Sequence, residues 1–297
     1  MRLDHWPLFE ELADCQSILL AGAGGGYDVY SGLPLYFALR AIGKTVHLAN
    51  LSFATLPEGR NSRLTPACVA VTADTPCGGS YFPELRLAEW FRQERGEEQT
   101  VYAFPQTGVA PLIEAYRHLQ GRLNLDAVIL VDGGTDSLMK GDEVGLGTPE
   151  EDIASIAAVH SLVGCKKLLA CIGFGVDTFH GVCHAQFLEA VAELTRIGAF
   201  LGVSTVLPNT HGAAEFLSAV NHANQNTVHR QSIVANSIAS AVEGHFGNSH
   251  RTRRTEGSEL WISPLMPMYW AFQLEPVARR NLYLDSLRET RSLFEVT

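Results

Sequence analysis

Short apolar segments alternate along the chain with longer segments in which apolar residues recur every three or four positions. Runs rich in leucine and β-branched residues are typical of strands, and several of these runs are apolar throughout, as expected of strands covered on both faces. The predicted strands are 17–22, 45–50, 67–73, 100–104, 127–132, 168–174 and 200–207. The predicted helices between them are 33–43, 83–96, 110–124, 149–164, 183–198 and 212–224.

Strands that alternate with helices favour an α/β fold with a doubly wound, mostly parallel, Rossmann-like sheet and helices on both faces. After the last of these helices the pattern weakens. A further helix is predicted over 231–246, followed by a polar and basic stretch and by a terminal helix over 277–294. We therefore expect a single α/β domain over residues 1–297, in which residues 226–297 form a C-terminal extension packed on the rest.

The helix that begins at Pro149 has the clearest start signal. Thr148 is suited to cap it, and Glu151 stands where the acidic partner of a capping box is expected. Proline is favoured in the first turn because its missing N–H would be unpaired there in any case.

The composition restricts the kinds of partner that the chain can bind. The sequence holds 32 acidic and 22 basic residues, for a net charge of −10, so general binding to nucleic acid or to an anionic membrane is not expected. Six cysteines form no CxxC pair, the N-terminal stretch is acidic, and no stretch of about eighteen apolar residues occurs. These features predict a cytoplasmic protein that binds a small molecule.

Three of the predicted strands end in glycines that are accompanied by aspartate. In a parallel sheet the carboxyl ends of the strands share one edge, where ligands usually bind, so these carboxylates are expected to lie close together. They are Asp28 after the first strand, Asp132 and Asp136 at and after the fifth, and Asp177 after the sixth.

Carboxylates collected in this way repel one another unless a cation, a hydroxyl-rich ligand or protons compensate them. We predict a metal site at Asp132, Asp136 and Asp177, with Mg²⁺ as the preferred ion because it favours hard oxygen ligands. Asp132 and Asp136 are also the predicted catalytic carboxylates. The alternative is that each aspartate merely completes a turn or caps a helix.

Glycines at the same strand ends predict close approach of a ligand to the backbone. The amides of Gly24, Gly25 and Gly26 are candidates for an anion-binding nest, and Asp28 and a second loop are further candidates for substrate contacts. The residues of that second loop are Gly133, Gly134 and Thr135. A GxGxxG fingerprint is missing, the strand at 45–50 lacks a ribose-binding acid, and no GxxxxGK[ST] motif occurs, so a standard NAD site and a P-loop are disfavoured.

Histidines supply candidate acids and bases. His180 follows Asp177 closely and is a predicted catalytic residue, because imidazole titrates near neutral pH. An alternative is a zinc site formed by His180 and His184 with Cys183.

Two later loops add candidates. His211 is a second predicted catalytic histidine, and Asn209 before it is a predicted substrate contact. Arg251, Arg253 and Arg254 form a basic patch suited to phosphate or carboxylate, and a salt-bridged surface would explain the patch equally well.

The sequence also resembles a known family. The segments GAGGGYDV, VDGGTDSLMKGDEVGLGTPEED, GFGVD and GSELWISPLM are similar to those of a prokaryotic domain of unknown function, family 1152. The resemblance implies an α/β globular protein and no particular reaction.

The leading hypothesis is an enzyme, a hydrolase or transferase, that acts on a small phosphorylated sugar-like or nucleotide-like substrate with the assistance of Mg²⁺. One alternative is a non-catalytic sensor of a nucleotide or related metabolite. Another is a Rossmann-type enzyme that uses NAD or S-adenosylmethionine. An apolar segment at 260–272 is compatible with a homodimer.

Overall fold

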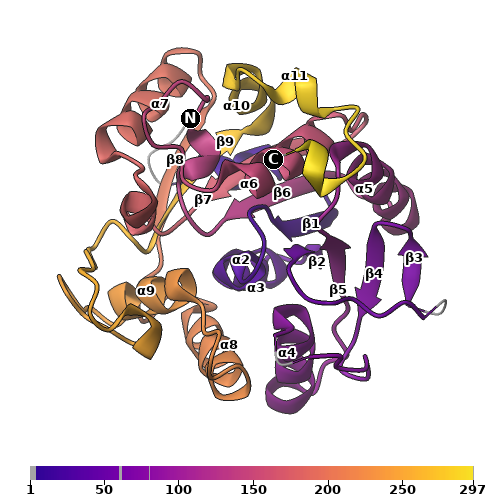
Figure 1. Ribbon diagram of the computed structural model, residues 1–297, viewed down its shortest axis with the longest axis horizontal. Helices are drawn as coiled ribbons and strands as arrows, with labels where there is room; N and C mark the ends of the chain where they lie inside the picture. The colour runs from indigo at the N-terminus through magenta and orange to yellow at the C-terminus, as the bar shows by residue number, and fades with distance from the viewer. Residues whose placement is uncertain (1–4, 60–61, 80, 297) are drawn as a thin grey trace.

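Five parallel strands form the centre of the sheet. The computed structural model describes residues 5–59, 62–79 and 81–296, and in these residues nine strands form one mixed sheet in the order β3-β4-β5-β2-β1-β6-β7-β9-β8 (Figure 1). The parallel strands, in sheet order, are β5 (Val101–Pro105), β2 (Thr45–Ser52), β1 (Ser17–Gly22), β6 (Ala127–Asp132) and β7 (Lys166–Cys171). Every residue of β6 is buried, as expected for a strand that is covered on both faces.

The two edges of the sheet are antiparallel. On one side β4 (Cys68–Val71) runs against β5, and β3 (Arg63–Thr65) runs against β4. On the other side β9 (Met268–Gln273) lies between β7 and β8 (Phe200–Thr205), antiparallel to both. The strands predicted at 67–73 and 200–207 therefore form as β4 and β8. Each is antiparallel to the strand with which it pairs, β5 for β4 and β9 for β8. Neither β3 nor β9 was predicted.

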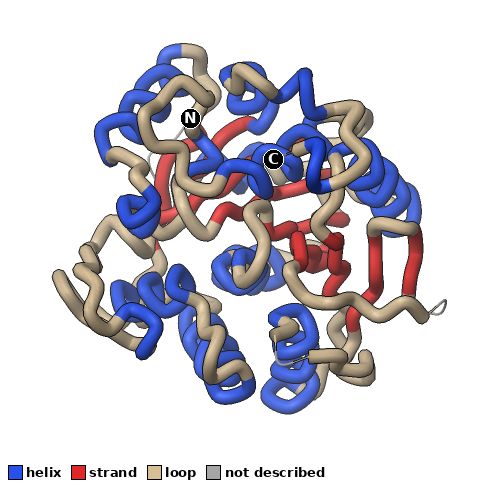
Figure 2. The backbone as a smooth tube through the Cα atoms, in the orientation of Figure 1, coloured by secondary structure: helices blue, strands red, loops and turns tan. Residues whose placement is uncertain are grey.

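Helices cover both faces of the sheet (Figure 2). Neighbouring residues of β1 point to opposite faces. Leu19 joins one core and Leu20 the other. The helices on the Leu19 face are α5 (Val109–Leu123), α6 (Pro149–His160), α7 (His184–Arg196), α10 (Leu274–Arg280) and α11 (Leu284–Leu287). Those on the Leu20 face are α1 (Pro7–Glu11), α2 (Asp28–Ser31), α3 (Leu33–Ala41), α4 (Pro83–Trp90), α8 (Ala213–Asn226) and α9 (Ile233–Val242).

The C-terminal part of the chain enters the sheet as well as covering it. β9 supplies a strand, α9 packs on one face, and α10 and α11 pack on the other. The single terminal helix predicted over 277–294 is wrong, because the chain leaves helical geometry between α10 and α11. There the amide of Leu282 donates to the carbonyl of Lys140 at 2.9 Å. No helix in the described part of the chain is long and apolar enough to cross a membrane.

Candidate functional site

Aspartates converge at the carboxyl ends of three adjacent strands, as predicted from the glycine-aspartate pattern. Asp28 begins α2 (Asp28–Ser31) after β1, and Asp132 is the last residue of β6. Asp136 begins a 3₁₀ turn, η2 (Asp136–Leu138), and Asp177 lies in another, η3 (Val176–His180), after β7. Carboxylate oxygens of Asp28 and Asp132 lie within 4.8 Å of each other, and a β-carbon at Gly134 would meet oxygens of both Asp132 and Asp177. The charge of Asp136 contributes to the raised pKa of the other three acids.

A fifth carboxylate, that of Asp152, comes from the first turn of α6 and was not predicted. Carboxylate oxygens of Asp28, Asp132 and Asp152 all lie within 4.8 Å of one another, close enough to share one cation. The predicted metal ligands were Asp132, Asp136 and Asp177, so only Asp132 belongs to both sets. The sequence gives no signal that separates Asp152 from Glu150 and Glu151 in the same turn, and only the structure shows that it is buried beside Ser155.

Glycines provide the space into which the carboxylates fit. A β-carbon at Gly133 would lie 2.6 Å from Oδ1 of Asp28, and one at Gly134 would lie 2.6 Å from Oδ2 of Asp177. A β-carbon at Gly147 would lie 2.3 Å from Oδ2 of Asp136. Atoms do not approach a real β-carbon so closely, so these glycines allow the backbone and the acids to pack together.

Hydroxyl and amide donors fix the orientation of two of the acids. Ser137 donates from Oγ and from its amide to Oδ2 of Asp132. Thr135 donates from its amide to Oδ2 of Asp177 at 2.6 Å and from Oγ1 at 3.3 Å. Thr135, predicted as a substrate contact, thus positions an acid.

The other two predicted acids are bonded in the same way. The amide of Gly24 donates to Oδ2 of Asp28 at 2.7 Å, so this member of the predicted anion nest is bonded to a carboxylate of the protein itself. Thr148 donates from its amide to Oδ2 of Asp136 at 2.8 Å and from Oγ1 at 3.4 Å. The side chain of Thr148 forms no capping bond with α6, so the predicted capping box is wrong.

Asp152 differs from the other four acids in its hydrogen bonding. Its side chain is buried, with 3% of the residue exposed. Its Oδ1 has no hydrogen-bond partner among the described residues. A buried carboxylate oxygen that lacks a donor is costly, and a bound cation would relieve that cost.

Burial raises the pKa of all five acids, and repulsion from neighbouring carboxylates adds to the effect for all but Asp136. Burial raises the pKa of Asp28 to about 8, with further contributions from Asp136 and Asp177. Burial and neighbouring acids raise the pKa of Asp132 and of Asp152 well above its usual range. The salt bridges within residues 5–59, 62–79 and 81–296 include none of the five.

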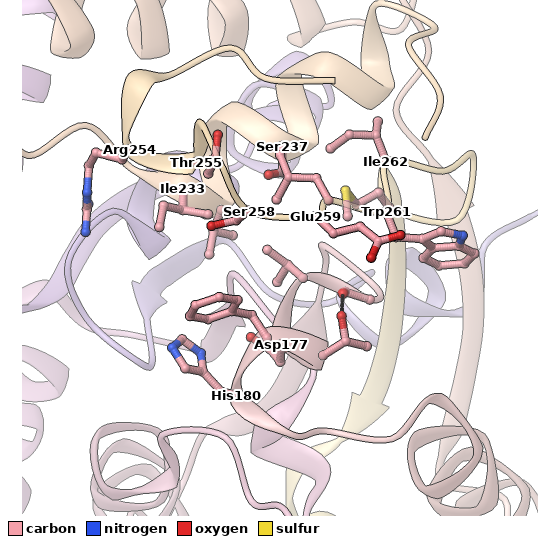
Figure 3. Close-up of a pocket in the computed structure, with 17 residues that line it drawn as sticks. Asp177, His180, Ile233, Ser237, Arg254, Thr255, Ser258, Glu259, Trp261 and Ile262 are labelled. Carbon is pink, nitrogen blue, oxygen red and sulfur yellow. Dashed lines mark hydrogen bonds between the residues drawn. The ribbon is translucent and has the colours of Figure 1, made fainter. Parts of the chain in front are cut away.

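A cavity of about 140 Å³ adjoins the cluster at Asp177. Figure 3 shows Asp177 and His180 on one side of it and Ser237, Thr255 and Trp261 on the other. Burial raises the pKa of Asp136, and the exposed His180 lies near enough to that carboxyl to offset a small part of the rise. Of the predicted histidines, His180 is therefore the one placed beside the acids.

The predicted arginines are divided. Arg254 lines the cavity, and its Nη1 donates to the carbonyl of Gln231 at 2.6 Å. Arg251 forms an ion pair with Glu243, and its Nη2 donates to Asn221 at 2.8 Å, which matches the salt-bridged alternative. Arg253 is exposed to solvent.

The remaining predicted residues lie in other surroundings. His211 lines a separate hollow with Trp6 and Tyr269, and Asn209 is exposed in the loop before it. The ring of His184 stacks on Phe174 with centroids 4.8 Å apart, so it packs among aromatic rings.

The fold and the site define an α/β protein with a mixed sheet and a buried acidic cluster at the carboxyl edge of its parallel strands. The chain belongs to the family described as "Protein of unknown function (DUF1152)", whose model matches residues 67–297. The predicted family is thus confirmed. The match includes the acids from Asp132 to Asp177 and leaves GAGGGYDV outside. Comparisons with curated proteins and with solved structures gave no match.

Proposed function

We propose that the chain is an enzyme that binds a divalent cation, preferably Mg²⁺, at Asp28, Asp132 and Asp152 and hydrolyses or transfers a group of a small anionic substrate. The observation that carries the proposal is the approach of these three carboxylates to within 4.8 Å of one another. Three hard oxygen ligands in a buried site favour Mg²⁺, and the carboxylate of Asp152 has an oxygen, Oδ1, without a hydrogen-bond partner among the described residues.

The strand order supports this location for a ligand. The parallel strands have the order β5-β2-β1-β6-β7, as in a Rossmann-like sheet. In this order β2 and β5 lie on one side of β1, and the later strands β6 and β7 lie on its other side. In such sheets ligands bind outside the carboxyl ends of the strands, at the point where the order changes sides. Here that point lies between β1 and β6. Asp28 follows β1, and Asp132 is the last residue of β6.

Each group has a distinct role in the proposed reaction. The cation would neutralise charge that develops on a phosphoryl or glycosyl oxygen. Asp177 faces both the cluster and the cavity, so it is suited to hold a substrate hydroxyl. His180 lies in the cavity wall beside the acids and would accept the proton that the attacking water or hydroxyl group loses. Arg254 supplies a positive charge for the anionic part of the substrate.

The surroundings of the glycine loop favour this proposal over a dinucleotide enzyme. A β-carbon at Gly25 would lie 2.7 Å from Cζ of Phe53, and one at Gly26 would lie 3.1 Å from the Tyr81 hydroxyl. Aromatic side chains of the protein thus lie against the loop on which a pyrophosphate would have to rest.

Turnover assays with a panel of sugar phosphates and nucleotides test the proposal. We expect turnover of at least one compound with Mg²⁺ and its loss in EDTA, in Asp132→Asn and in Asp152→Asn. Asp142→Asn is the control, because Asp142 forms its ion pair with Lys140 on the surface. Turnover that survives in both cluster variants would contradict the proposal. A sensor would bind a compound from the panel and turn over none.

A further inference from the structure

The cavity beside the acidic cluster has the size and lining of a site for one ring. Its volume of about 140 Å³ matches the size of cavity that accepts a benzene-sized molecule. Most of its lining is apolar, and Phe179 and Trp261 provide aromatic surface. The exposed fraction of Trp261 is 40%, so part of the indole remains free for contact.

The cavity and the cluster are separated by the thickness of one residue. A β-carbon at Gly133 would lie 2.6 Å from Oδ1 of Asp28 and 3.3 Å from Cγ1 of Val234. Val234 lines the cavity, and Asp28 belongs to the proposed cation site. Asp177 lines the cavity and also belongs to the cluster. Asp177 is therefore the acid of the cluster that a molecule in the cavity can contact directly.

Polar side chains interrupt the apolar lining, and they include the carboxylates of Asp177 and Glu259. Ser237 and Thr255 come from the side formed by α9 and the loop after it, and Arg254 lies beside them (Figure 3). The guanidinium group of Arg254 is suited to an anionic substituent, because it offers several donors in one plane. Apolar surface with a few polar groups is the usual lining of a small-molecule site.

We propose that this cavity binds a single aromatic ring of the substrate, and that the ring carries an anionic group directed toward Asp177 and the cation. The orientation of the anionic group toward the cation rests on the proposed function, whereas the binding of the ring rests on the cavity alone. The substrate class is thus a monocyclic aromatic compound with a phosphate substituent.

Fluorine NMR with 4-fluorophenyl phosphate tests the proposal. Ile233→Trp places a large ring in the cavity, and Ser258→Trp does so from a different segment of the chain, which covers the case in which one variant fails to fold. The control is Val228→Trp, because Val228 is 63% exposed and lies outside the cavity lining. We expect binding to the wild type and the control, and at least tenfold weaker binding to each folded cavity variant.

Inorganic phosphate and EDTA separate the two proposals. Equal affinity of the probe for the wild type and the cavity variants, or no binding to the wild type, would overturn the ring site. If Mg²⁺-dependent binding of inorganic phosphate persisted in that case, the proposed cation function would stand. Binding of the probe that depends on the cavity but is the same in Mg²⁺ and in EDTA would support the ring site and remove the support for the cation.

Discussion

Asp152 places its carboxylate against the backbone of Gly24, where a β-carbon would lie 2.8 Å from Oδ2 of Asp152. One residue belongs to the loop after β1 and the other to α6, so the contact joins segments that are far apart in the sequence. A second contact accompanies it, because Ser155 donates from Oγ to the carbonyl of Ala23 at 2.7 Å. The fold thus holds α6 and its acid in the cluster, although repulsion between carboxylates opposes this arrangement.

Replacing one of the clustered acids should stabilise the metal-free protein. Asp132→Asn removes a buried charge and its repulsion with Asp28 and Asp136. We expect the free energy of unfolding in EDTA at pH 8 to rise, because burial and the neighbouring acids oppose the charged form of Asp132. Urea denaturation of the variant and the wild type measures the difference. A large loss of stability would show that the carboxylate is structural.

Mg²⁺ should stabilise the protein through Asp152. We expect Mg²⁺ to raise the melting temperature of the wild type and to have little effect on Asp152→Asn, because binding to the folded state alone raises stability. Glu150→Gln is the matched control in the same helix turn, since Glu150 is exposed. Thermal melts with Mg²⁺ and with EDTA test this. An equal shift in the two variants would place the ion elsewhere.

The raised pKa values predict a pH dependence with a defined sign. An aspartate in the unfolded chain releases its proton near pH 4, whereas Asp28 in the folded protein does so at about 8. The folded state therefore binds more protons between these values, and the free energy of unfolding in EDTA should fall as the pH rises from about 4 to about 8.

Mg²⁺ must displace those protons, so its affinity should increase over the same interval. Denaturation and Mg²⁺ titrations at pH 5–9 measure both effects, and Asp28→Asn should flatten both curves. Stability that rises with pH over this window would contradict the account.

The glycines of the acidic loop should not tolerate a side chain. In Gly134→Ala the new β-carbon would meet Oδ2 of Asp177 at 2.6 Å and Oδ1 of Asp132 at 3.1 Å. We expect a loss of about 1–3 kcal/mol in stability together with loss of Mg²⁺ stabilisation.

Gly121→Ala is the matched control for this substitution. A β-carbon at Gly121, within α5, would meet no heavy atom of the described residues within 4 Å, apart from its chain neighbours and the backbone of its own helix. Alanine there should add about 0.5–1 kcal/mol through helix propensity. Equal effects of the two substitutions in thermal melts would contradict the packing role of Gly134.

The sequence predicted the parts of the fold that have a clear local pattern. Apolar runs identified β1 and β6, and their glycine-aspartate ends correctly placed Asp28 and Asp132 at one edge of the sheet. β9 was missed because its residues MYWAFQ lie in a region without helix-strand alternation, and its position between β7 and β8 depends on pairing with distant strands.

The composition of the site was harder to predict than its location. Asp152 stands in a helix start with two other acids, where acidic residues commonly stabilise the helix dipole, so local sequence did not distinguish it. Only the packing of α6 against the loop after β1 brings it to the cluster. His211 also follows a strand, but that strand lies beyond β9, away from the three strands that form the site.

The most direct test is a crystal structure of the full chain soaked with Mn²⁺, with anomalous scattering measured near the manganese edge. Mn²⁺ accepts the same oxygen ligands as Mg²⁺ and can be located by its own signal. The account predicts one anomalous peak in contact with carboxylate oxygens of Asp28, Asp132 and Asp152. A cluster without a peak, while manganese binds elsewhere on the chain, would contradict it.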